Sequence, residues 1–115
     1  MDGLIVKQPF ANKIISGRKK RELRLWPPPV KKMNRNIYLL SNGYALGIIK
    51  IVSAKSLSTR AKTLKLKSVQ TRKVIKYRYA WFLKVVKKFR RPVRYSHPRG
   101  AQIWVNDVKL IGSTR

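Results

Sequence analysis

A run of alternating residues from Ile75 to Val85 restricts the fold of this chain more than any other feature. Successive side chains of a β-strand point to opposite faces, so an apolar–basic alternation indicates a strand with one buried side. The apolar side of this run carries Ile75, Tyr77, Tyr79, Trp81, Leu83 and Val85. The other side carries Lys76, Arg78 and Lys84, which should form a row facing solvent. We predict one long strand here, ended by Pro92 and a loop at 96–100.

The N-terminal residues predict a short strand followed by a helix. The strand covers 4–7, and Pro9 suits the first turn of a helix, where a missing backbone N–H does no harm. The helix has an apolar stripe at helical spacing that consists of Phe10, Ala11, Ile14 and Ile15. Gly17 suits the left-handed position that ends such a helix.

A second strand is predicted from Lys20, where the period of the sequence changes to two. One face carries Leu23 and Leu25, and the other carries Lys20, Glu22, Arg24 and Trp26. The prolines at 27–29 stop this strand and give a stiff, extended loop.

The middle of the chain predicts a hairpin. An apolar strand at 37–40 is followed by Asn42-Gly43, a pair that tolerates the positive φ angles of a tight turn. The partner strand covers 44–52, with Gly47 at a bulge or kink. The lysine-rich segment 53–73 predicts an irregular or partly helical insertion. Residues 102–105 predict a last short strand or a turn of helix.

These elements predict a mainly β (α+β) fold, in which about five or six strands form a small barrel with one early helix. Closure into a barrel removes exposed strand edges. The chain has 115 residues, of which 43% are apolar, so it can form one core within a single domain covering 1–115.

The charge of the chain predicts an anionic partner. Lys and Arg number 29, Asp and Glu number 3, and the formal net charge is +26. The acids are Asp2, Glu22 and Asp107, so none lies between Glu22 and Asp107. A polyanion relieves the self-repulsion of such a protein and releases counterions on binding. Nucleic acid is the expected partner, because no basic amphipathic helix indicates a membrane anchor.

Other function classes are disfavoured by what the sequence lacks. There is no cysteine and only His97 among the histidines, so we expect no disulfide, no metal site and no cofactor. No apolar run is long enough for a transmembrane helix, and the first residues do not resemble a secretory signal. We expect an intracellular protein, with a monomer favoured.

The segment Gly17-Arg18-Lys19-Lys20-Arg21-Glu22-Leu23-Arg24 resembles the Gly-x-Lys-x-x-Glu-x-Arg signature of ASCH domains. The preceding stretch, 6–11, has the matching order of strand and proline-containing helix. Two later stretches, 79–93 and 97–104, also resemble the family. The resemblance implies a PUA-like barrel with a cleft beside the first helix, and RNA or DNA binding.

The resemblance also implies an alternative function. Some small relatives are nucleases or hydrolases that deacetylate N4-acetylcytidine, and in these the lysine matching Lys19 is catalytic. Glu22 stands where that group has a threonine, and a later catalytic glutamate has no acidic counterpart here. These differences favour a binding role, although Lys19 and Glu22 are the residues an enzyme of this kind would use. A structural ribonucleoprotein component is the other alternative.

The predicted binding residues fall into a motif cluster and a wider basic surface. Lys19, Glu22 and Arg24 either contact phosphate and base edges or form a structural ion-pair cluster. The other residues expected to contact nucleic acid are Lys7, Lys13, Arg18, Lys20, Lys76, Arg78, Lys84, Lys87, Lys88, Arg90, Arg91, His97 and Arg99. Trp26 and Trp104 lie beside loops and are the expected base-stacking residues, whereas Trp81 is expected in the core.

Overall fold

The computed structural model describes residues 1–57, 64–67 and 74–111 of the chain. Six strands form the main sheet in the order β2-β7-β4-β3-β1-β8, and β5 and β6 pair as a separate hairpin. The elements in chain order are β1 (Gly3–Ile5), α1 (Phe10–Ile15), β2 (Arg21–Arg24), η1 (Val30–Lys32), β3 (Ile37–Ser41), β4 (Tyr44–Ser56), β5 (Leu64–Lys67), β6 (Val74–Tyr77), β7 (Tyr79–Arg94) and β8 (Trp104–Val105).

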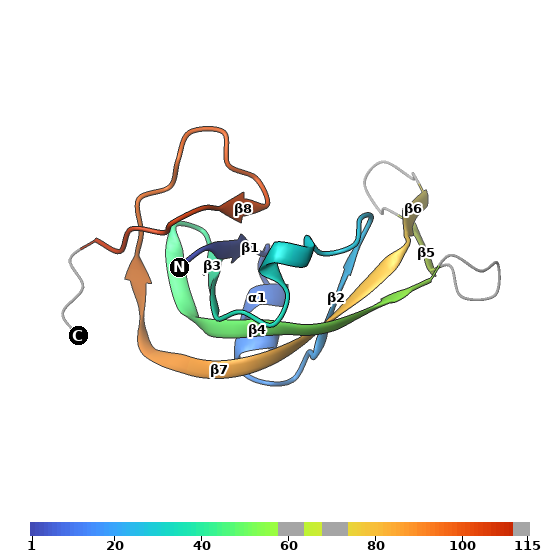
Figure 1. The fold of residues 1–115 in the computed structure, drawn as a ribbon, viewed down its shortest axis with the longest axis horizontal. Helices are drawn as coiled ribbons and strands as arrows, with labels where there is room; N and C mark the ends of the chain where they lie inside the picture. Colours follow the sequence, from blue (N-terminus) through green and yellow to red (C-terminus); the bar gives the residue numbers. More distant parts are fainter. Residues whose placement is uncertain (58–63, 68–73, 112–115) are drawn as a thin grey trace.

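The antiparallel pair of β4 and β7 is the centre of the molecule, and the two strands curve side by side along its length (Figure 1). Their register shifts at three points, between Ala45 and Gly47, between Ile48 and Ile49, and between Ile51 and Ser53. Such irregularities bend a strand and increase its twist. The main sheet therefore curls into a half-barrel, which confirms the predicted mainly β, PUA-like fold class.

The predicted long strand from Ile75 is divided at Arg78 between β6 and β7. Pro92 does not end it as predicted, because β7 continues to Arg94. Ala45 pairs with Val93 and Gly47 pairs with Lys88, so Pro92 lies in the interrupted part of the ladder. A proline is tolerated in a strand at such a bulge, where its missing N–H is not needed.

The β3–β4 hairpin is confirmed at Asn42-Gly43. Both residues have positive φ angles, 52° and 86°, as the two-residue turn requires. Gly47 lies at one of the irregular positions of β4, in agreement with its predicted role. A Cβ atom there would lie 2.3 Å from the Lys87 carbonyl oxygen and 2.6 Å from Ile15 Cδ1. Glycine is thus required where β7 and α1 both approach β4.

Helix α1 lies against the curled sheet, into which it buries Ala11, Ile14 and Ile15. The remaining member of the predicted stripe, Phe10, is exposed instead of buried. Gly17 follows the helix with a φ of 83°, which confirms the left-handed end. The chain then turns directly into β2, at one edge of the sheet.

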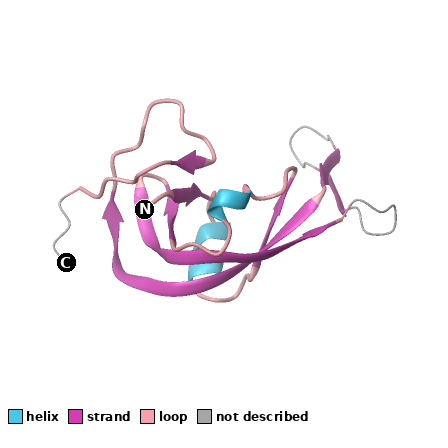
Figure 2. Ribbon diagram, viewed as in Figure 1, coloured by secondary structure: helices cyan, strands magenta, loops and turns pink. Residues whose placement is uncertain are grey.

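The segment 53–73 differs from the predicted irregular insertion wherever it is described. Strand β4 continues to Ser56, and β5 pairs antiparallel with β6 to make an arm at the far end of the molecule (Figures 1 and 2). The backbone bond from Leu57 N–H to the Arg78 carbonyl, at 2.6 Å, joins the two chain segments at the point where the arm leaves the main sheet. The predicted helical part at 58–63 and 68–73 lies outside the described residues. Within the described ranges, no helix is long and apolar enough to cross a membrane.

Candidate nucleic-acid interface

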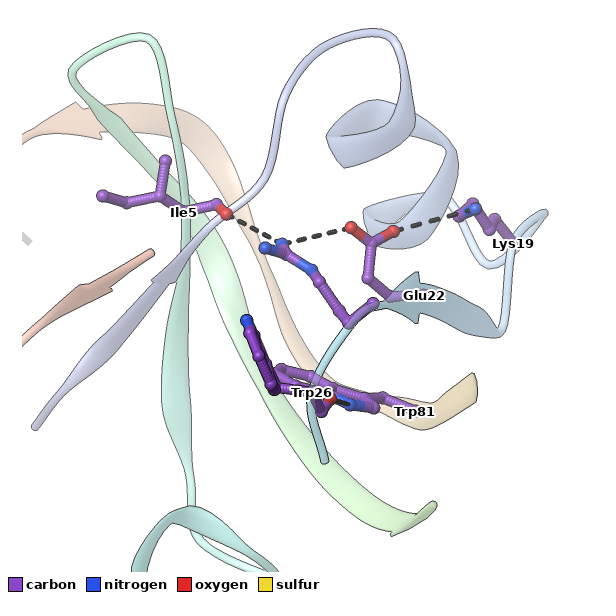
Figure 3. A network of polar contacts seen from close by, with 6 residues as sticks. Ile5, Lys19, Glu22, Trp26 and Trp81 are labelled. Carbon is purple, nitrogen blue, oxygen red and sulfur yellow. Dashed lines mark hydrogen bonds and ion pairs between the residues drawn. The ribbon is translucent and has the colours of Figure 1, made fainter. Parts of the chain in front are cut away.

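The structure brings together the three motif residues Lys19, Glu22 and Arg24 (Figure 3). Glu22 Oε2 lies 3.1 Å from an Arg24 terminal nitrogen, and Glu22 Oε1 lies 3.7 Å from Lys19 Nζ. The side chains are 12% exposed at Glu22 and 19% exposed at Arg24. We call these three residues the motif cluster.

Local structure explains why the motif cluster faces inward. Glu22 pairs across the ladder with Trp81, which is buried, so both side chains point to the inner face of the half-barrel. The turn at Gly17 brings Lys19 back to α1, where its N–H donates to the Lys13 carbonyl at 3.0 Å. Its ammonium then lies 5.0 Å from the centre of the Phe10 ring, a cation–π contact that uses the exposed phenylalanine.

Arg24 also connects two strands that do not pair through their backbones. Its guanidinium donates to the Ile5 carbonyl at 3.1 Å and lies 5.5 Å from the centre of the Trp81 ring. Strand β2 is one edge of the sheet, and Ile5 lies on β1 near the other edge. Arg24 therefore closes part of the gap in the half-barrel. Its Nε atom is buried without a hydrogen-bond partner among the described residues.

The tryptophans have three different environments. Trp81 is buried as predicted, and its Nε1–H donates to the Trp26 carbonyl at 2.9 Å. Trp26 is 69% exposed, so its ring is available for stacking while its backbone is held. Trp104 is only partly exposed, since its ring stacks on Trp81 with centroids 6.0 Å apart. The second predicted stacking residue is thus packed against the core.

The sequence of residues 4–93 matches the ASCH domain, and this match begins within β1 and ends within β7. The chain belongs to the ASCH domain family. ASCH domains are PUA-like, and the family is an RNA-binding one. The match ends at Val93, so the resemblance inferred for 97–104 lies outside it. The search of curated proteins found no match.

His97 of this ASCH domain has both ring nitrogens engaged within its own loop. Nδ1 lies 2.7 Å from the Tyr95 hydroxyl, and Nε2 lies 3.0 Å from the Ala101 carbonyl oxygen. Burial raises the pKa of Tyr95 above its ordinary value. In the neutral imidazole tautomer whose Nε2–H donates to the Ala101 carbonyl, Nδ1 accepts from the Tyr95 hydroxyl. The predicted phosphate contact of His97 would require this loop to rearrange.

Most of the predicted basic surface is exposed. The exposed members are Lys7, Lys13, Arg18, Lys20, Arg78, Lys84, Lys87, Lys88, Arg90, Arg91 and Arg99. The Lys76 side chain lies outside the described residues, so the predicted row beside Arg78 and Lys84 stays a prediction at that position. The described residues contain no group of three or more His, Cys, Asp or Glu side chains that could hold a metal ion.

Two hollows adjoin this surface, and sequence reasoning missed the larger one. A cavity of about 450 Å³ lies beside the start of β3, and residues that had not been predicted line it, among them Arg35 and Lys50. A second cavity, of about 270 Å³, is lined by Lys19, Lys20 and Lys84 at the end of α1. The available signal was Lys50 itself, a single cation within the apolar run of β4.

Proposed function

We propose that this ASCH domain binds RNA, mainly through its phosphate backbone. The observation that carries the proposal is the state of the three acids. Asp2 pairs with Lys32, Glu22 with Lys19 and Arg24, and Asp107 with Lys109. The chain has no other Asp or Glu side chain to neutralise its remaining cations. An external polyanion is the partner that supplies the missing charge.

The exposed lysines and arginines of β7 and of the loops around α1 contact phosphates in this proposal. Each phosphate they neutralise releases condensed counterions, so affinity should fall steeply with salt. Such contacts position a nucleic acid but do not read its bases. Any selectivity among bases then comes from the motif cluster and from Trp26.

Trp26 supports a preference for unpaired bases. A base can stack on its exposed ring, and the bases of single-stranded RNA are available for stacking whereas those of a duplex are not. The loop is also stiff, because three prolines follow and the Trp26 carbonyl is held by Trp81. A loop whose backbone is already held loses little conformational entropy on binding.

The proposal is tested by titrating the protein with a 12-nucleotide oligouridylate, the matching DNA and an RNA duplex, each at two salt concentrations. We expect the logarithm of the binding constant for the single strand to fall against log salt with a slope of about −3, as for four or five phosphates. A slope near zero, or no binding at low salt, would refute the proposal.

The stacking role is tested in the same titration with Trp26→Ala. This change should weaken single-strand binding by about 1 to 3 kcal/mol. Val30→Ala is the matched control, because Val30 is an apolar residue beyond the same prolines and is 88% exposed. Equal affinities for the two variants would exclude Trp26 as a stacking platform.

A further inference from the structure

The larger hollow lies outside the motif cluster and has a distinct chemistry. It has a volume of about 450 Å³ and is lined by Asp2, Lys32, Asn34, Arg35, Asn36 and Lys50, among others. We call it the β3 pocket. Its lining comes from η1, from the loop before β3 and from the middle of β4, so that the fold, and not one loop, builds it.

The three cationic side chains that line the β3 pocket differ in whether they have a hydrogen-bond or ion-pair partner. Lys32 Nζ donates to Asp2 Oδ2 at 2.6 Å and to Asn106 Oδ1 at 2.9 Å, so it has its partners within the fold. Arg35 and Lys50 have no carboxylate partner among the described residues, since Asp2 is the only acid that lines the pocket. Two cations are thus left to face an open hollow.

The backbone holds these cations in place. Asn34 has a positive φ of 58°, and its N–H donates to the Ile51 carbonyl at 2.8 Å, which fastens the loop beside β4. Ile37 pairs with Ile49, so the next residues, Asn36 and Lys50, come side by side. Lys50 lies between the buried residues Ile49 and Ile51, so its side chain points to the outer face of the sheet.

Lys50 is also opposed by a second lysine. It pairs across the ladder with Lys84 on β7, so the Cβ atoms of these two lysines lie about 5 Å apart. Like-charged side chains directly opposite each other destabilise the free protein. Lys84 in turn lines the smaller cavity together with Lys19 and Lys20. The cations therefore continue across β4 and β7, from the β3 pocket to Lys19 and Lys20 after the end of α1.

We propose that the β3 pocket binds one unpaired nucleotide of an RNA strand whose backbone continues over Lys50 and Lys84 to the loop at Lys19. Arg35 and Lys50 bind the phosphate of this nucleotide. The side-chain amides of Asn34 and Asn36, which can both donate and accept, bind the edge of its base. This inference rests on the proposed function and adds to it a second site and a direction for the strand.

The dimensions and chemistry of the pocket favour a single unpaired nucleotide. Pockets for small ligands have volumes of about 300 to 1,000 Å³, so this one can hold a nucleotide but not a duplex. In a duplex the Watson–Crick edges of the bases are already paired with one another, so they are not available to the asparagines. Adjacent strands lie about 4.8 Å apart, so the distance from Asn36 across β4 to β7 suits a few successive phosphates.

The test compares two double variants that remove the same charge. Arg35→Gln with Lys50→Gln removes the two free cations of the pocket, whereas Lys55→Gln with Lys109→Gln removes two exposed cations that are not assigned to the binding surface. With the 12-nucleotide oligouridylate, the pocket variant should bind at least about tenfold more weakly, and its salt slope should be smaller by about 0.7, because one phosphate contact is lost. The control variant should change affinity less than about threefold.

Each failure has its own meaning. If the wild-type protein binds no RNA, both the proposed function and this inference are overturned. If it binds RNA but the two double variants behave alike, the β3 pocket is not a site and the proposed function stands. If the pocket variant weakens duplex binding as much as single-strand binding, or if uridine monophosphate binds as tightly as the oligouridylate, the proposed strand path is wrong.

A measurement on the wild-type protein avoids any dependence on the folding of the variants. Oligouridylate should shift the backbone amide resonances of Asn36 and Lys50 in an NMR titration and leave that of Lys55 unchanged. Shifts that are absent from Asn36 and Lys50 while RNA binds would overturn the inference.

Discussion

Asp2 joins three segments that are far apart in the sequence. Its Oδ1 accepts from the Asp107 N–H at 2.8 Å, and its Oδ2 accepts from Lys32 Nζ at 2.6 Å. The Lys32 ammonium also lies 5.3 Å from the centre of the Trp104 ring. A single carboxylate therefore holds η1 and the loop after β8 against the N-terminal strand, at the edge of the β3 pocket.

Asp2→Asn should lower the free energy of unfolding at neutral pH by about 1 kcal/mol, a value reduced from that of a buried charged hydrogen bond because Asp2 is partly exposed. Hydrogen bonds from Lys32 and from the Asp107 N–H lower the pKa of Asp2 in the folded protein. Its contribution is therefore complete above the ordinary aspartate pKa of about 4 and is lost as the pH falls further.

Urea denaturation of both proteins at several pH values measures this difference. The stabilities should converge as the pH falls below about 4. Asp107→Asn is the control, since the Asp107 side chain is 80% exposed and its pair with Lys109 is 3.7 Å long. A difference between wild type and Asp2→Asn that is constant with pH would contradict the explanation.

The motif cluster shows how far residue patterns predict a site. Period two places Glu22 and Arg24 on one face, and the turn at Gly17 places Lys19 beside them, so their proximity could be predicted. The bond from Arg24 to the Ile5 carbonyl could not, because it depends on how far the sheet curls. The inward-pointing face of β2 could not be predicted either, because a charged face is expected to point to solvent and here it points to the inside of the half-barrel.

Within β4, the irregular positions set the curvature of the whole sheet. At Gly47 the Lys87 backbone and the Ile15 side chain of α1 both lie close against β4. A side chain there would meet a backbone oxygen, which cannot move aside by rotating. Gly47 thus links the bend of β4 to the position of the helix that ends at the motif cluster.

Gly47→Ala should destabilise the protein by about 3 kcal/mol, as expected for overpacking a close backbone contact. Gly100→Ala is the comparison. It has a positive φ of 82° but no atom within 4 Å of an added Cβ, so it should cost only the backbone strain of about 1 kcal/mol. Thermal and urea unfolding of both variants gives the measurement, and equal losses would show that the contact at Gly47 is not tight.

The strands could be predicted only where local signals are strong. Asn42-Gly43 defines its own turn, because that turn depends on neighbouring residues alone. The alternation at 75–85 predicted one continuous strand, whereas the structure divides it at Arg78 between β6 and β7, because the pairing partners change there. Pro92 gave a wrong end for β7, since a bulge in the ladder is a property of two strands. The lysine-rich residues at 64–67 resembled a loop, because the pairing that makes them a strand comes from β6.

The whole molecule carries far more repulsion than attraction between its charges. Its net charge is +26, and the ladder places Lys50 opposite Lys84 within the central pair of strands. Hydrophobic burial has to outweigh this repulsion in the free protein. Added salt screens exposed charges over a distance of about 10 Å at 0.1 M, so the stability of the fold should depend on ionic strength.

The midpoint of thermal unfolding should rise by several degrees when sodium chloride is increased from about 10 mM to about 150 mM. A variant with Lys55→Glu and Arg99→Glu, which lowers the net charge by four, should show a smaller rise. Differential scanning calorimetry provides both values. A midpoint that is unchanged or lower in salt would mean that self-repulsion contributes little to the stability of this protein.

Side chains span the gap between the two margins of the curled sheet. The Arg24 guanidinium donates to the Ile5 carbonyl on β1, and the Trp104 ring stacks on the Trp81 ring. Such a junction can be altered one substitution at a time, whereas a backbone ladder changes only when a whole strand shifts register. Proteins built on this half-barrel can thus differ in the width of the opening between β1 and β2 while every strand keeps the same neighbours.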